Sequence, residues 1–425
     1  MVDYLKAGVA ELEITGQVGL KLAAEFNSRN STGVRTPLMA KVLYLSSGDR
    51  ALVIVTLDLY GLEEEATETL KHAIAERCDI EPEAVMLVSS HTRYAPYTTP
   101  VVGGDGVAQA YIDEVIAKVP EVVVEAKNGC QKASLGIGRA ELPHLIYNHR
   151  LMTRNLKAVT AWLGVPENEI LKPEGPIDPE FYVIVVRDDR GEPMCLLWNF
   201  AADIRFFSIH GADIGNAFSA SMPFYVQEEL DMRVGRHVPA LYLGGCGGNV
   251  SYTYDIETTT DAVTSAVMAV QLEKQCDPVI ALDGQEEQMV LPIRDYTEFW
   301  DRPDIEMKYP EGVDAYAQEL EALREEGAKA VPTRVQVFRL GPYALVGLPG
   351  MPFVEFALDL KAQSPFRETL VAGNANGHPG YVITREAFEH GGFETWTARS
   401  AKIGPGGGEF MVEEVVGFLK ELADH

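Results

Sequence analysis

The sequence has few cysteines and no long hydrophobic run, and both absences limit what the protein can be. Its five cysteines, at positions 78, 130, 195, 246 and 276, contain no Cys-x-x-Cys pair. An odd number of scattered cysteines is untypical of a disulfide framework or of a structural zinc site. No stretch approaches the roughly 18 apolar residues of a membrane-spanning helix, and Met1–Leu20 lacks the basic and apolar regions of a signal peptide. We therefore expect a cytoplasmic protein with reduced thiols and no membrane partner.

Positive charge is scarce as well. The 425 residues include 36 Lys and Arg but 63 Asp and Glu, which gives a formal net charge of −27. This excess of negative charge repels phosphate groups, so it argues against nucleic acid or an anionic membrane surface as the main partner. The content of hydrophobic residues, 46%, is ordinary for a globular protein. A chain of this length can bury a large core.

Strand-like and helix-like segments are interspersed along the chain, which predicts an α/β fold. Residues 51–59 and 85–89 are apolar on both faces, as is typical of buried strands. Residues 62–77, between them, have apolar side chains at helical spacing.

Two hairpins are also predicted, because turn residues separate 182–187 from 194–198 and 333–340 from 343–348. Hairpins beside crossover helices predict mixed sheets flanked by helices rather than a purely parallel sheet. No linker is evident, so we expect a single domain over residues 1–425. Further helices are predicted at 219–230, 258–273, 313–328 and 409–422, and a surface excursion at 292–312.

Polar residues follow several apolar strands directly, and strand ends are where a rigid scaffold presents reactive side chains. His91 and Arg93 come just after the strand 85–89. A histidine there is either a metal ligand or general base, or simply bonded to backbone at the strand end. Asp203 and Arg205 interrupt an apolar run, and they form either part of a site or a structural ion pair.

Three further segments join these candidates. Four glycines in residues 244–248 precede Asn249 and Ser251, and such a loop either brings backbone close to a ligand or makes a tight turn. The loop lacks the spacing of a Walker or dinucleotide-binding motif. The segment 373–385 gathers more polar side chains than a structural loop needs: Asn376, His378, Tyr381 and Arg385. The third segment is Asn148, His149 and Arg150, which belongs to a site or to a solvated loop.

These segments, in this order, resemble the catalytic domain of the neutral (non-lysosomal) ceramidase family. Ser89–Pro96 is similar to the family's Thr-His-Thr-His-Ser-x-Pro motif, and Asn148–Arg150 to its Asn-Arg-Arg segment. Gly245–Tyr252 is similar to its Gly-x-x-Gly-Asp-Val-Ser-Pro loop, and Asn376–Glu394 completes the match. The resemblance spans nearly the whole chain. It implies the catalytic domain alone, without the C-terminal β-sandwich of the lipid-cleaving members.

The resemblance also implies a zinc site made of two His, one Glu and one Tyr. His91 and Tyr381 match two of these ligands, but Asp203 stands where the second His is expected and Met351 where the Glu is expected. A thioether cannot replace a carboxylate as a ligand for Zn²⁺. Arg93 replaces another family histidine and brings a positive charge that opposes a cation. We therefore expect loss of zinc rather than retention; His91, Asp203 and Tyr381 are the residues that would hold it, with His210 and His378 as substitute ligands.

The resemblance and its departures together indicate an enzyme that acts on a small polar or anionic substrate, not on ceramide. We expect a hydrolase of an amide- or ester-type bond, and a homo-oligomer is compatible with the sequence. Two alternatives remain: a metal-independent lyase or isomerase that uses His and Tyr for proton transfer, and an inactive ligand-binding protein. The expected catalytic residues are His91, Arg93, His149, Ser251 and Tyr381. The expected substrate-binding residues are Asn148, Arg150, Arg205, Gly247, Gly248, Asn249, Asn376, His378 and Arg385.

Overall fold

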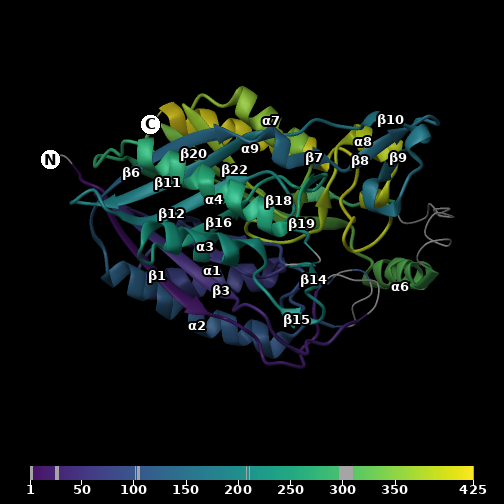
Figure 1. The fold of residues 1–425 in the computed structure, drawn as a ribbon, viewed down its shortest axis with the longest axis horizontal. Coiled ribbons are helices and arrows are strands. Elements are labelled where there is room, and N and C mark those ends of the chain that lie inside the picture. Colours follow the sequence, from purple (N-terminus) through teal and green to yellow (C-terminus); the bar gives the residue numbers. More distant parts are fainter. Residues whose placement is uncertain are drawn as a thin grey trace.

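Two stacked sheets form the centre of the molecule, and helices cover the outer face of each (Figure 1). The computed structural model describes residues 3–23, 28–100, 102, 106–206, 208–209, 211–295 and 310–424. The larger sheet has eight strands in the order β16-β12-β11-β6-β1-β3-β4-β5. The smaller has four, in the order β18-β19-β20-β22. The chain therefore has a four-layer α/β/β/α arrangement.

Both sheets are mixed. In the larger sheet, β4–β5 and β12–β16 are parallel pairs and the other neighbours are antiparallel. In the smaller sheet only β20–β22 is parallel. The strands of the larger sheet are β1 (Lys6–Glu13), β3 (Met39–Ser47), β4 (Arg50–Leu57), β5 (Val85–Ser89), β6 (Gln131–Glu141), β11 (Glu180–Asp188), β12 (Pro193–Phe200) and β16 (Ala240–Gly244). Those of the smaller sheet are β18 (Leu282–Pro292), β19 (Ala330–Leu340), β20 (Tyr343–Gly347) and β22 (Glu368–Ala372).

The helices cover three surfaces. Helices α1 (Glu64–Cys78) and α2 (Gln109–Asn128) pack on the half of the large sheet that contains β3, β4 and β5. Helices α3 (Met222–Val234) and α4 (Ile256–Glu273) cover the other half, and α7 (Val354–Gln363) and α9 (Gly407–Asp424) cover the small sheet. At the end far from both termini lie α6 (Pro310–Glu326), α8 (Arg385–His390) and three short strands, β8 (Arg150–Thr153), β9 (Ala158–Thr160) and β10 (Ile170–Pro173) (Figure 1).

The main core lies between the sheets, where alternate residues of each strand point inward. Ile54 and Leu197 of the large sheet and Phe338 and Leu345 of the small sheet are all fully buried there. Burying so much apolar surface is the dominant stabilising contribution to such a layered fold.

The predicted α/β fold with mixed sheets is confirmed, and so are both hairpins. The strand 85–89 has the predicted bounds, whereas the strand predicted to reach residue 59 ends at Leu57. The helix predicted from residue 219 starts at Met222, because Ser221 before it has a positive φ of 59°. Helix α2 was not predicted at all, and it contains Pro120, which usually interrupts a helix. Most of the predicted excursion 292–312 lies outside the described residues.

The two edges of the large sheet meet through the segment Gly373–Asn376, which follows β22. The N–H of Gly373 donates to the carbonyl of Gly244 at the end of β16 (2.8 Å). On the other side, the N–H of Ser89, in β5, donates to the carbonyl of Asn374 (3.1 Å). The loops that follow β5, β12, β16 and β22 therefore lie close together at one end of the sheets. No helix in the described part of the chain is both long and apolar enough to cross a membrane.

Candidate functional site

The candidate site is a small cavity where these strand ends meet. Its volume is about 20 Å³, which is room for roughly one water molecule. Residues from all four strand ends line it, among them Ser89, His91, Asp203, Gly245, Met351 and Asn374. The loops after β5, β12, β16 and β22 therefore meet at this cavity.

His91 lies in the wall of this cavity with an unusual backbone conformation, φ 65°. Its Nδ1 is 2.9 Å from the carbonyl oxygen of Tyr60. Because a carbonyl only accepts, Nδ1 carries the proton and Nε2 carries the lone pair. Nε2 is buried and has no hydrogen-bond partner among the described residues. Burial, more than any charge, lowers the pKa of His91 to about 4, so the ring is neutral at pH 7 and can accept a proton or a hydrogen bond.

Arg93 and Asp203 form an ion pair beside His91, with Nη2 and Oδ2 3.2 Å apart. Each keeps one buried atom without a partner in the described structure, Nε of Arg93 and Oδ1 of Asp203. Burial alone would raise the pKa of Asp203, but the positive charges of Arg93 and Arg205 hold it below its usual value. Arg205 lies 5.0 Å above the ring of Trp162. The site thus contains one anion and two cations.

A second group of polar residues adjoins the first. Ser251 lies in β17 (Val250–Tyr252), which pairs with β7 (Ile146–Asn148). Its Oγ is 2.8 Å from Nδ1 of His149, and Nε2 of His149 is 3.2 Å from Oε1 of Glu394. The backbone N–H of Asp203 donates to the carbonyl of Val250 (3.0 Å). Ser251 is therefore a direct neighbour of the Arg93–Asp203 pair.

Glu394 is 1% exposed and remains a carboxylate. Burial raises its pKa, but the charge of Arg150 and the hydrogen bond from His149 outweigh this and bring the value to about 2. The hydroxyl of Thr160 also donates to Glu394, at 3.0 Å.

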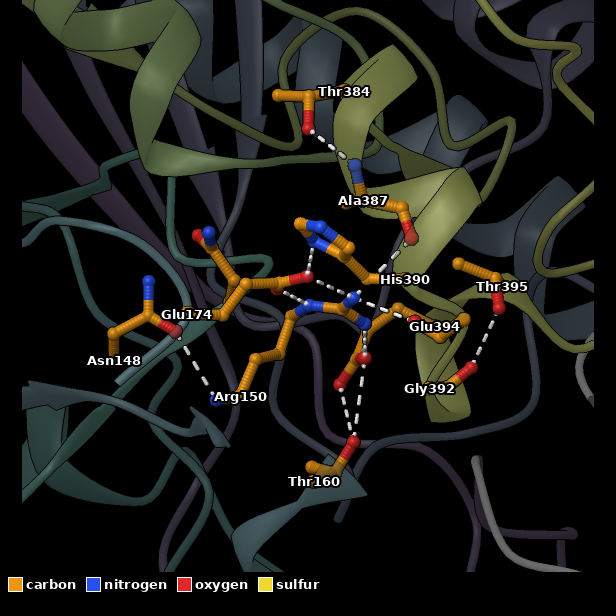
Figure 2. A network of polar contacts seen from close by, with 12 residues as sticks. Asn148, Arg150, Thr160, Glu174, Thr384, Ala387, His390, Gly392, Glu394 and Thr395 are labelled. Atoms are coloured by element: carbon orange, nitrogen blue, oxygen red, sulfur yellow. Dashed lines mark hydrogen bonds and ion pairs between the residues drawn. The ribbon is translucent and has the colours of Figure 1, made fainter. Parts of the chain in front are cut away.

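Arg150 does not face the cavity. Figure 2 shows its fully buried guanidinium between the carboxylates of Glu174 and Glu394. It also donates to the carbonyl of Gly391 (2.6 Å). We expected Arg150 to bind substrate, but its donors are already used within the protein. The sequence could not show this, because both carboxylates that hold Arg150 come from other segments of the chain.

Three asparagines that we expected to bind substrate are likewise engaged within the protein. In each, the amide oxygen accepts from a backbone N–H and the amide nitrogen donates to another group. Asn148 accepts from the N–H of Arg150 (3.1 Å) and donates to the carbonyl of Pro176 (2.9 Å). Asn249 accepts from the N–H of Val354 (2.9 Å) and donates to the carboxylate of Glu355 (2.8 Å). Asn376 accepts from the N–H of Leu87 (2.9 Å) and donates to the side-chain oxygen of Gln336 (2.7 Å). These side chains hold neighbouring segments together.

The remaining predicted residues lie at different distances from the cavity: some lie beside it, one is on the surface, and one falls outside the described residues. Gly247 and Gly248 let the loop pack closely against neighbouring backbone. A Cβ at position 247 would lie 2.7 Å from the backbone of Asp203, and a Cβ at position 248 would lie 2.6 Å from the carbonyl oxygen of Met351. His378 lies near His91, with ring centroids 5.3 Å apart. Arg385 is exposed at the start of α8. His210 lies outside the described residues.

Two neighbours of His91 were not among the expected site residues, although one of them, Asn374, lies in the candidate segment 373–385. The ring of Tyr60 is 4.0 Å from that of His91 and 5.8 Å from the guanidinium carbon of Arg93. Asn374 binds Nδ1 of His378 through its amide oxygen (2.6 Å) and donates to the Tyr60 carbonyl (2.7 Å). Tyr60 directly follows a predicted buried strand, and this position was the signal that could have identified it.

The donor set at the matched positions does not fit a zinc ion. His91 and Asp203 offer one free donor atom each, whereas a catalytic zinc site takes three protein ligands. Met351 is a thioether, and burial raises the pKa of the Tyr381 phenol, which disfavours the phenolate. Among the described residues, no three or more His, Cys, Asp and Glu are placed to hold a metal ion together. We assign no step of a reaction to a metal.

A larger cavity, of about 290 Å³, shares Ser90 and Tyr242 with the first. Asp58 lies in its wall, and its carboxylate accepts from the N–H of Met39 (2.9 Å). Burial nevertheless raises the pKa of Asp58 to about 6. In the folded protein Asp58 therefore holds a proton over a pH range in which the unfolded chain has lost it.

This difference predicts a stability effect with a definite sign. Between about pH 4 and pH 6 the folded state binds more protons at Asp58 than the unfolded state, so the contribution of Asp58 to stability falls as pH rises. We expect Asp58→Asn to raise the free energy of unfolding at pH 7 by roughly 1–3 kcal/mol, and the gain to shrink toward pH 4. Urea unfolding of both proteins from pH 4 to pH 8 measures it; a difference that is constant with pH would contradict the assignment.

Similar proteins were found by comparing structures and not by comparing sequences. The sequence matches no protein-family model and no curated protein. The crystal structure of neutral ceramidase from Pseudomonas aeruginosa matches 99% of this chain and 75% of its own, with a TM-score of 0.74 and 18% identity. The chain has the fold of neutral ceramidase. A structure of a ceramidase complexed with C2 matches with the same TM-score, identity and coverage.

The ceramidase-like fold confirms the fold that the sequence motifs implied. At 18% identity it establishes the arrangement of layers and strand ends but not the reaction. The chemistry depends on the residues at those strand ends.

Proposed function

We propose that the protein is a hydrolase that cleaves an amide- or ester-type bond in a small polar or anionic substrate. One observation carries the proposal: three buried polar atoms without partners in the described structure occur together, Nε2 of His91, Oδ1 of Asp203 and Nε of Arg93. Leaving such an atom unpaired costs about 1–3 kcal/mol. Clusters of these atoms are therefore typical of sites that are completed by a ligand.

The charges favour an anionic substrate. Arg93 stays protonated, because the attraction of Asp203 outweighs the effect of burial and raises its pKa. Arg205 is close enough to influence the pKa of both His91 and Asp203. Two guanidinium groups against one carboxylate leave a locally positive site in a protein whose formal net charge is −27. Arginine suits recognition of a carboxylate or phosphate because its planar donors match the oxygens of those groups.

The ceramidase-like fold supports hydrolysis over other reactions, because a ceramidase is built on the same arrangement. A neutral His91 supports it too. Its free lone pair can take a proton from water or from a hydroxyl group, as a general base does. The two arginines can stabilise the negative charge that develops on a carbonyl oxygen.

The test is a panel of N-acyl amino acids, N-acyl sugar acids, lactams and small esters, each paired with an uncharged analogue. Products are identified by mass spectrometry in heavy-oxygen water. We expect an anionic member to be cleaved with incorporation of one solvent oxygen, at a kcat/KM at least about 10-fold above that of its uncharged analogue. Turnover without oxygen incorporation would instead favour the lyase or isomerase, and binding without turnover would favour the inactive binding protein.

The control is His91→Ala, which removes the base and leaves the ion pair in place. We expect loss of turnover with the thermal unfolding midpoint little changed. A fully active His91→Ala protein would show that the reaction takes place elsewhere.

A further inference from the structure

We propose that the cavity of about 290 Å³ is a binding site for a small organic ammonium ion, and that Asp58 is the residue that binds the ammonium group. This inference goes beyond the proposed hydrolase, because it concerns a different cavity and requires no reaction. It is carried by a buried carboxylate in the wall of a cavity that is large enough for an organic molecule.

The cavity has the size and the lining of a small-molecule site. A water molecule takes about 30 Å³ in the liquid, so the volume is room for roughly ten non-hydrogen atoms. Part of the lining comes from β1, β3 and β4, and another part from β16 and α3. Met39, Pro223 and Phe224 supply apolar surface, and only a few polar groups interrupt it. Such a lining is typical of pockets that bind organic ligands.

Asp58 is the polar group on which the proposal depends. It is 9% exposed, and its Oδ2 accepts from the N–H of Met39 at 2.9 Å. A carboxylate can accept several hydrogen bonds. Burial raises the pKa of Asp58 to about 6, more than the charge of Lys41 lowers it. At pH 7 most molecules therefore hold an ionised carboxylate there, at a free-energy cost that a bound cation would offset.

Lys41 also lines the cavity, but its ammonium group is already bonded to other partners. It donates to Oε1 of Gln227 (2.7 Å) and to the carbonyl of Ala240 (3.0 Å), and it lies 3.3 Å from Oε1 of Glu11. These three contacts match the three donors of an ammonium group. Lys41 therefore acts on Asp58 through its charge and leaves room for a second cation.

His237 marks the side on which the cavity meets solvent, because its side chain is 53% exposed. Its Nε2 is 2.6 Å from Oε2 of Glu11, and its Nδ1 is 2.7 Å from Oδ2 of Asp231. Since both carboxylates accept, His237 makes both hydrogen bonds as an imidazolium. Its positive charge is thus matched by Glu11 and Asp231, and it does not provide an anion site.

The charges of the wall favour a cation over an anion. The charged side chains of the described lining are Glu11, Lys41, Asp58 and His237, and with Asp231 beside them three carboxylates face two cations. The formal net charge of −27 also attracts cations to the protein. Phe224 and Tyr242 add aromatic rings to the lining, and aromatic rings attract organic cations. A primary ammonium ion fits best, because its N–H groups can donate to Asp58.

The test compares benzylammonium with benzyl alcohol, which have nearly the same shape and differ in charge. Isothermal titration calorimetry at pH 7 is run in about 0.15 M salt, which screens attraction to the exposed carboxylates. We expect one benzylammonium ion per chain, bound at least about 10-fold more tightly than the alcohol, because a hydrogen bond between ionised groups is stronger than one to a neutral group. Equal affinities in the wild-type protein would overturn the proposal.

Asp58→Asn keeps the shape of the side chain and removes its charge. We expect the two ligands then to bind within about 3-fold of each other, because the charge-assisted hydrogen bond is lost. Asp189→Asn is the matched control, because Asp189 is exposed, and we expect it to keep the wild-type preference. A preference for benzylammonium that survives in Asp58→Asn would show that the overall negative charge attracts the ligand, and would overturn the site.

A second variant places the ligand in the cavity. Thr56 lines the cavity, and Thr56→Met puts a longer side chain into its wall. We expect both benzylammonium and benzyl alcohol to bind at least about 10-fold more weakly, because the added atoms occupy the space that either ligand needs. Unchanged binding of both to the folded variant would locate them elsewhere. Since no substrate is used, that result would leave the proposed hydrolase standing.

Discussion

Replacing Arg150 with alanine is expected to lower the free energy of unfolding by about 3–5 kcal/mol. The guanidinium is fully buried and ion-paired with both Glu174 and Glu394, and it also binds two backbone carbonyls. Removing it leaves two carboxylates in a low-dielectric interior without their arginine counter-charge, and most of the cost arises from that loss of charge compensation. Equilibrium urea unfolding at pH 7 measures the change.

The matched control is Arg233→Ala. Arg233 also bridges two carboxylates, Glu229 and Asp261, but its side chain is 30% exposed. Water can solvate the carboxylates that remain, so we expect a loss of about 0–1 kcal/mol. Arg150→Lys keeps the charge without the planar donor set and should fall between the two. Equal losses at positions 150 and 233 would show that burial of the Arg150 network contributes nothing.

Replacing Arg93 with methionine is expected to raise the pKa of His91 and to lower kcat/KM for the anionic substrate at least about 100-fold. Burial is the main reason that the pKa of His91 is about 4; Arg93 lowers it further, whereas Asp203 raises it. Without Arg93, less positive charge opposes the effect of the Asp203 carboxylate, which raises the pKa of His91. His91 would then hold a proton at a pH where the wild-type ring is neutral, so the acid limb of the pH–activity profile moves to higher pH.

The titration can be followed without any substrate, by the NMR shift of the His91 ring proton between pH 3 and pH 8. The control is Arg236→Met, because Arg236 is an exposed arginine whose side chain lies 3.5 Å from Glu192 and 2.8 Å from the Pro193 carbonyl, outside the site. A midpoint for His91 that stays near 4 in Arg93→Met would contradict the electrostatic coupling between the two residues.

Local patterns predicted much of the fold. The strand 85–89 and both hairpins were predicted because a continuous apolar run and turn residues are properties of neighbouring residues. His91 and Arg93 were identified for the same reason, as polar residues at the end of an apolar strand. Helix α2 was missed because Pro120 contradicts its local pattern, and packing on the sheet overrides that signal.

Partner choice within the site could not be predicted. Glu394 meets His149 across 245 residues of sequence, and Glu174 meets Arg150 across 24. Nothing in the sequence near Arg150 distinguishes a guanidinium that binds substrate from one that neutralises buried carboxylates. That distinction depends on which charged side chains the tertiary fold brings into a low-dielectric interior, and periodicity carries no information about it.

The segment Gly373–Asn376 ties the candidate site to the packing of the two sheets. It bonds to β16 on one side and to β5 on the other, so it joins the two edges of the large sheet. His91 and Asp203 come from loops beside those edges, and the segment that joins the edges directly follows β22 of the small sheet. Contacts so distant in sequence carry a large loop-closure cost and are formed together with the whole fold. The candidate site therefore requires both sheets, and neither sheet alone supplies all the residues that line it.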